Sequence, residues 1–127
     1  MYAPFTVITN NPLIIESGWP SIQVTGSIEE VLQKVLEMTL VGYRLLSHPL
    51  SGSVKPAVNP YKSILISPAP AGVDYREVEI VLTCLDKVKD MRRQAQSVHW
   101  GEVVDADLRF LDCELIKSGI QSLVNVS

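Results

Sequence analysis

The segment from Ser47 to Ser63 reads SHPLSGSVKPAVNPYKS, and it gathers side chains that could contact an oxyanion or a phosphate ester. Its three prolines stiffen the backbone, and the amides around Gly52 add further donors. The candidate ligand contacts in it are His48, Ser51, Gly52, Ser53, Lys55, Tyr61 and Lys62. The spacing is not that of a phosphate-binding GxxxxGK[ST] loop. An ordered connection made of turn residues is therefore the alternative to a binding loop.

Charge is distributed unevenly along the chain, and the uneven part coincides with this segment. Between Glu37 and Asp74 there are three basic residues and no acidic one, whereas the rest of the chain holds eight basic and fourteen acidic residues. Such an interval favours binding of a small anionic ligand.

His48 is the candidate catalytic residue of an alternative interpretation, in which the chain is a small enzyme acting on a phosphorylated or acylated molecule. His48 would act as acid or base, and Lys55 or Lys62 would stabilise charge. No carboxylate lies near His48 in the sequence to fix its tautomer, so we expect ligand contact or a structural hydrogen bond ahead of a catalytic role.

Asn10 and Asn11 follow the first predicted strand, a place where α/β proteins often bind ligands. We include both in the candidate binding site. Asparagine also forms turns through its own backbone, so a turn is the alternative interpretation. The acidic residues near the C-terminus, including Asp105 and Asp112, do not have EF-hand spacing, and we expect them on a solvated helix start.

Hydrophobic spacing predicts seven elements in the order β-β-α-β-β-α-α. The predicted strands are Phe5–Ile8, Ile22–Val24, Tyr43–Leu46 and Ser63–Ser67. The predicted helices are 28–41, 75–96 and one or two further helices in the last third. Ser27 with Glu30, and Asp74 with Glu77, have the spacing of capping boxes, and Gly42 is placed to end the first helix. The pattern predicts one compact α/β domain over residues 1–127, with a small sheet of about four strands and helices packed on it.

Composition excludes several classes of partner. A net charge of −3 offers no basic face for nucleic acid. No apolar run is long enough to span a membrane, and the first Lys or Arg is Lys34, so we expect a cytoplasmic protein without a secretory signal. Cys84 and Cys113 form no CxxC motif, so we expect buried free thiols, no metal site and no cofactor.

Three stretches together resemble the GrdX family. They are VITNNPLI at residues 7–14, GYRLLSHPLSGSVKPAVNPYKSILIS at residues 42–67 and LRFLDCELIKSGI at residues 108–120. The most specific part is the HPLSGSVKP stretch followed by PYKS. Proteins of that family are encoded beside subunits of glycine reductase and related selenoprotein reductases.

The resemblance implies an accessory protein of the glycine, sarcosine or betaine reductase system. The expected partners are a small anionic ligand, which the acid-free interval also favours, or a reductase subunit. A purely structural or assembly factor that forms a homo-oligomer through its helices is a further alternative. The family supplies no catalytic residues to carry over, so whether the chain is an enzyme stays open at this point.

Overall fold

The computed structural model describes residues 4–50, 59–94 and 102–125 of the chain. Its elements are β1 (Thr6–Thr9), α1 (Pro12–Glu16), β2 (Ser21–Gln23), α2 (Ile28–Val41), β3 (Ser63–Ile66), α3 (Tyr75–Gln94) and α4 (Glu102–Asn125). The sheet has the order β2-β1-β3, with β1 parallel to β2 and antiparallel to β3. The predicted α/β class with helices packed on a small sheet is confirmed.

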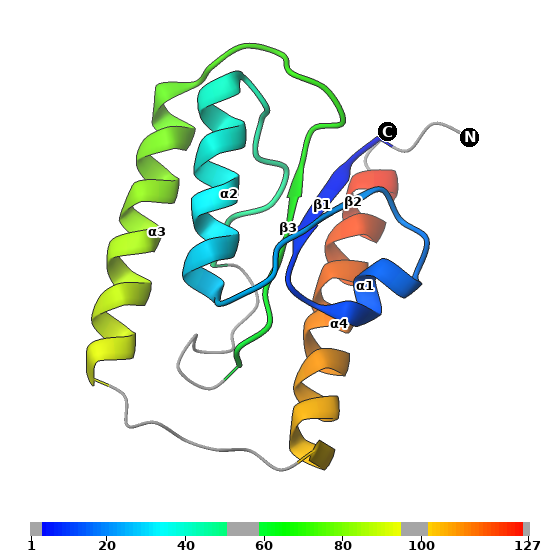
Figure 1. Ribbon diagram of the computed structural model, residues 1–127. Helices are drawn as coiled ribbons and strands as arrows, with labels where there is room; N and C mark the ends of the chain where they lie inside the picture. Colours follow the sequence, from blue (N-terminus) through cyan, green and yellow to red (C-terminus); the bar gives the residue numbers. More distant parts are fainter. Residues whose placement is uncertain (1–3, 51–58, 95–101, 126–127) are drawn as a thin grey trace.

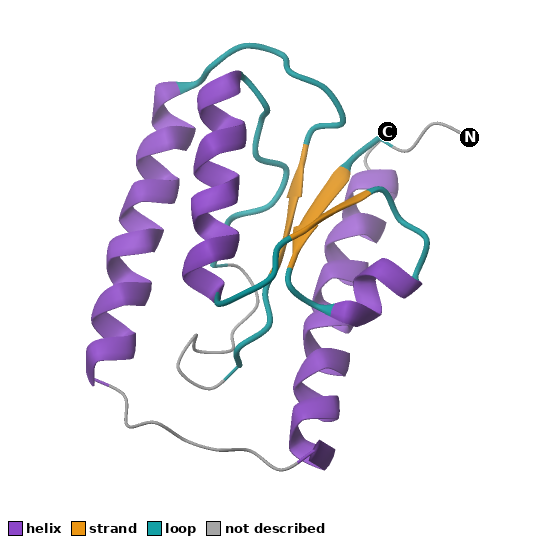
Figure 2. Ribbon diagram, in the orientation of Figure 1, coloured by secondary structure: helices purple, strands orange, loops and turns teal. Residues whose placement is uncertain are grey.

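The three strands form a central layer between two pairs of helices (Figures 1 and 2). Helices α2 and α3 pack against each other on one side, and α1 and α4 lie on the other. Because β1 and β3 are covered on both faces, their residues are buried on both faces, apart from the half-buried Thr6. This explains why the strands are short apolar runs.

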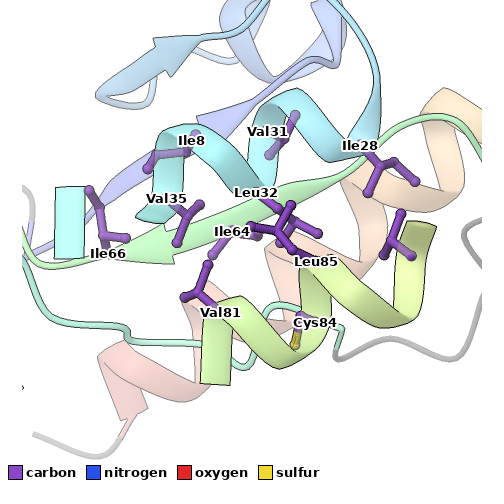
Figure 3. Packing of buried hydrophobic residues seen from close by; sticks show 11 residues of the cluster. Ile8, Ile28, Val31, Leu32, Val35, Ile64, Ile66, Val81, Cys84 and Leu85 are labelled. Atoms are coloured by element: carbon purple, nitrogen blue, oxygen red, sulfur yellow. The ribbon is translucent and has the colours of Figure 1, made fainter. Parts of the chain in front are cut away.

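Alternation along the strands divides the core in two. Ile8 and Ile64 point towards α2 and α3, where they pack with Leu32, Val81 and Leu85 (Figure 3). The next residues along each strand point the opposite way, since strand side chains alternate between faces. The second cluster consists of Phe5, Val7, Ile14, Leu65, Cys113, Ile116 and Ile120. Cys84 lies in the first cluster and Cys113 in the second, so both are buried free thiols, as the sequence predicts.

Helix α2 begins and ends where the sequence predicts. The Ser27 hydroxyl accepts a hydrogen bond from the Glu30 amide at 3.4 Å, and Gly42 ends the helix with φ of 111°. The Gly42 carbonyl then accepts hydrogen bonds from the amides of Ala71 and Gly72 at 2.8 and 3.1 Å. This turn joins the end of α2 to the segment that leads into α3.

The prediction of a fourth strand at Tyr43–Leu46 is wrong. The segment runs beside β3, but it forms only a single bridge, between Leu45 and Ile66. Two backbone hydrogen bonds flank this bridge, but side chains replace the other ladder bonds: the Arg44 amide donates to Ser67 Oγ at 2.9 Å, and the Leu65 amide donates to Ser47 Oγ at 3.0 Å. The sheet therefore has three strands, and a polar segment follows its edge.

Three further expectations need correction. Residues after Asn11 form the short helix α1 where the sequence predicts only a turn, and Asn11 caps it by accepting from the Leu13 amide at 3.1 Å. Glu77 does not complete a capping box with Asp74, because its carboxylate faces Arg44 and Leu45. Gly119 does not interrupt α4, which continues as one helix from Glu102 to Asn125.

Replacing Gly42 by alanine is expected to lower the free energy of unfolding by about 1–2 kcal/mol, because its left-handed backbone disfavours any side chain. A Cβ there would also lie 3.3 Å from the Gly72 nitrogen. Gly72 has the same φ of 111°, but a Cβ added at Gly72 would meet nothing within 4 Å, so Gly72→Ala is the matched control. Urea unfolding should show the larger loss for Gly42→Ala; equal losses would leave backbone strain as the sole cause.

Within the described ranges, none of the helices is both long enough and apolar enough to cross a membrane.

Candidate functional site

A hollow of about 260 Å³ lies where the beginning of β3 meets the middle of α4. Six of its nine lining residues have polar side chains, namely Ser47, Lys62, Ser63, Asp112, Ser118 and Ser122. Leu115, Ile116 and Gly119 complete the lining from α4. The predicted segment therefore contributes Ser47, Lys62 and Ser63, and α4 contributes the opposite side.

A buried hydrogen-bond network supports this hollow. Asp112 is only 5% exposed, and its Oδ2 accepts from the Ser63 hydroxyl at 2.7 Å and from Asn11 Nδ2 at 2.9 Å. Thr9 joins the network through its hydroxyl, which lies 2.8 Å from that of Ser63 and accepts from the Asn11 amide at 2.9 Å. Polar groups this deeply buried are stable only when hydrogen-bonded, so the network fixes the carboxylate in one orientation.

Strand register explains why these residues meet. Thr9 pairs with Ser63 across β1 and β3, and both lie on the face of the sheet that α4 covers. Asn11 lies two residues after the end of β1, and its side-chain amide also donates to the Arg109 carbonyl at 2.8 Å. The end of β1, the start of β3 and the middle of α4 are thereby joined at a single point.

Burial shifts the pKa values of the two charged groups of the hollow in opposite directions. It raises the pKa of the Asp112 carboxyl, and the hydrogen bonds from Asn11 and Ser63, with the nearby Lys62, only partly oppose this. It also lowers the pKa of the Lys62 ammonium group, which the negative charge of Asp112 opposes. Each charge therefore stabilises the other in surroundings that favour neither.

Asn10 positions the backbone that carries Lys62. Its side-chain amide donates to the Pro60 carbonyl at 2.9 Å and to the Gly26 carbonyl at 3.0 Å, and its oxygen accepts from the Lys62 amide at 2.9 Å. Asn10 is not among the residues that line the hollow. It fixes the end of the predicted binding segment against β1.

Tyr61 forms a separate polar cluster with α4. Its hydroxyl donates to Asp105 at 2.7 Å and accepts from Arg109 Nε at 2.9 Å, and the Arg109 guanidinium lies 5.3 Å from the ring centroid. Arg109 also pairs with Asp105 at 2.7 Å. Partial burial is the main cause that raises the pKa of Tyr61. This cluster anchors the segment before β3 to α4.

His48 is exposed, and its Nδ1 accepts from the Leu50 amide at 3.1 Å. It does not appear in the lining of the hollow. The other predicted contacts, Ser51, Gly52, Ser53 and Lys55, lie outside the described residues. The structure thus brings Lys62 and Asn11 to one site and leaves His48 apart from it.

The interval between Glu37 and Asp74 has no acidic residue in the sequence, but in the folded chain carboxylates from other segments lie near two of its basic residues. Arg44 receives two carboxylates from the start of α3, Asp74 at 2.9 Å and Glu77 at 3.0 Å. Hydrogen bonds from Arg76, with a smaller contribution from Arg44, lower the pKa of Asp74. Lys62 has Asp112 nearby. Folding therefore places carboxylates from α3 and α4 near two of the interval's basic residues.

Asp112 is the residue that sequence reasoning missed, because the acid-rich stretch around it predicts a solvated helix start. Its spacing contains a signal: Asp112, Ile116 and Ile120 recur every four residues and so share one face of α4. A carboxylate on an apolar stripe is expensive to bury, and it therefore indicates a buried polar site. Within the described residues, no three His, Cys, Asp or Glu side chains come together as a metal site.

Replacing Asp112 by asparagine is expected to change how stability depends on pH. The pKa of Asp112 in the folded chain lies above its ordinary value of 3.8, so ionisation favours unfolding. Wild-type stability therefore falls relative to Asp112→Asn as the pH rises from about 4 through the raised pKa, by at most about 1.4 kcal/mol per unit.

Urea unfolding of both proteins at pH 4, 5, 6 and 7 checks this expectation. The difference in unfolding free energy between variant and wild type should grow with pH and then level off. A difference that is constant or shrinks would show that Asp112 is not held in a raised-pKa environment. Lys62, the charged group that faces Asp112, is present in both proteins.

The model of a family described as GrdX-like protein matches residues 6–121. No curated protein and no solved structure matches the chain.

Proposed function

The chain belongs to the GrdX-like family, and from this premise we propose that it is an accessory protein of the glycine, sarcosine or betaine reductase system. In this role it is a binding module, and its site is the hollow between β3 and α4. The observation that carries the proposal is the deeply buried Asp112, which shares that hollow with Lys62. The proposal includes a cytoplasmic location and a small charged ligand or a reductase subunit as partner.

Burial of the Asp112 carboxylate beside a hollow, with the half-buried Lys62 near it, has a cost in stability that a purely structural role does not explain. Well-packed apolar residues at the same positions would commonly give equal or greater stability. A ligand that contacts these groups would make the arrangement useful, because charges held in place before binding need little reorganisation. Perturbed ionisable groups that face a concavity are for this reason a general mark of functional sites.

A binding assay with reductase subunits tests the accessory role. The immobilised full chain should retain at least one purified subunit of the reductase system, and a chain denatured before coupling serves as the control. Calorimetry with phosphate, acetyl phosphate and glycine tests the ligand. Absence of binding in both assays would contradict the proposed function, and size-exclusion chromatography of the same samples would reveal self-association.

A further inference from the structure

The hollow presents both signs of charge to whatever enters it. Asp112 supplies a carboxylate held by Asn11 and Ser63, and Lys62 supplies an ammonium group. A simple anion would be attracted by Lys62 and repelled by Asp112, and a simple cation would meet the reverse. In partly buried surroundings both effects are stronger than in water. A molecule that carries both charges can satisfy the two groups together.

Hydroxyl groups supply the remaining polar contacts. Ser47 Oγ accepts from the Leu65 amide at 3.0 Å, which leaves its own O–H as a donor. Ser122 donates to the Ser118 carbonyl at 3.2 Å, so its oxygen remains an acceptor. The wall can thus donate to a carboxylate and accept from an ammonium group.

Gly119 indicates that the volume of the hollow is maintained at a cost in the stability of α4. It lies well inside α4, where glycine is about 1 kcal/mol less favourable than alanine. Its φ is not positive, and an added Cβ would lie 3.4 Å from Leu65 Cδ1, which is ordinary contact. Neither backbone strain nor crowding requires glycine here. The missing side chain instead leaves room in a hollow that Gly119 itself lines.

The size of the hollow favours a ligand smaller than a drug-sized molecule. Its volume of about 260 Å³ is below the range of about 300–1,000 Å³ that pockets for drug-sized molecules occupy. We propose that this hollow binds a small α-amino acid in its zwitterionic form, with Asp112 facing the ammonium group and Lys62 facing the carboxylate. The inference rests on the proposed binding function and specifies its ligand class.

Calorimetry on the full chain tests the inference with glycine and its two half-ligands, acetate and methylamine. Glycine should bind, and each half-ligand should bind at least about tenfold more weakly, because it interacts favourably with only one of the two charged groups. Lys62→Met and Asp112→Asn should each weaken glycine binding about tenfold or more. Lys117→Met is the matched control, since Lys117 lies on the surface of α4 beside Glu114, and its affinity for glycine should equal that of the wild type.

Gly119→Ala keeps both charges and is expected to fold at least as stably as the wild type, so it tests the hollow without risk to the fold. Its glycine affinity should fall several-fold. If acetate bound as tightly as glycine, the proposal of a zwitterionic ligand would be overturned, and an anion-binding function would remain. If glycine did not bind at a concentration of about 10 mM, the inference would be overturned. The subunit assay would then decide the accessory role separately.

Discussion

Replacing Asn11 by aspartate is expected to lower the free energy of unfolding by about 3–5 kcal/mol at neutral pH, because it places a second carboxylate against a buried one. Asn11 Nδ2 lies 2.9 Å from Asp112 Oδ2 and donates to it, and Asn11 is fully buried. The substitution retains the size of the side chain and the oxygen that caps α1, but it removes both hydrogen bonds that the amide group donates.

Two observations separate charge repulsion from simple damage. Stability of the Asn11→Asp variant should recover in part at acid pH, where the two carboxyls share a proton. Adding Asp112→Asn should restore more than half of the loss at neutral pH, because the amide and the carboxylate then exchange places. Urea unfolding at pH 4 and pH 7 measures both effects. A double variant no more stable than Asn11→Asp would contradict direct contact between these residues.

Leu65→Ala is expected to lower the free energy of unfolding by about 2–5 kcal/mol. Leu65 is fully buried in the core cluster between β3 and α4, so its removal leaves a cavity directly behind the hollow. Leu40 lies on the surface of α2 and is 52% exposed, so Leu40→Ala is the matched control and should change stability by less than about 0.5 kcal/mol.

A second substitution tests the packing geometry of this region. The Cβ added by Gly119→Ala would lie 3.4 Å from Leu65 Cδ1, so it should border the cavity that Leu65→Ala creates and partly fill it. Gly119→Ala is therefore expected to stabilise the Leu65→Ala protein more than it stabilises the wild type. Simple additivity of the two changes in a double-mutant cycle would show that the residues are not in contact.

Helix α2 is the element that the sequence predicts best. Ser27 caps it, Gly42 ends it, and Ile28, Val31, Leu32 and Val35 are buried as their spacing predicts. On α3 the same reasoning succeeds for Val78, Val81, Leu85 and Val88, whereas Leu82 is 45% exposed. Local spacing is sufficient where a helix buries one stripe, because periodicity alone then decides which residues face the core.

The predictions that failed depend on contacts between distant segments. Tyr43–Leu46 has strand-like residues, but the hydroxyls of Ser67 and Ser47 take two of the hydrogen bonds that a fourth strand needs, and no local pattern reveals this. Asp112 is hydrogen-bonded to Asn11 and Ser63, which are 101 and 49 residues away from it in the sequence. Composition identifies the segment from Ser47 to Ser63, and Lys62 and Asn11 belong to one site. The carboxylate that changes the chemistry of that site is supplied by α4.

The central claim is that a small zwitterion binds beside Asp112 and Lys62, and an NMR titration with glycine tests it most directly. Backbone amide shifts of the ¹⁵N-labelled chain should change with glycine concentration, and the changes should centre on the residues that line the hollow, Ser47, Lys62, Ser63, Asp112 and Ser118. The Asp112→Asn chain should show little change under the same conditions. Shifts centred elsewhere, or equal responses in the two proteins, would contradict the account.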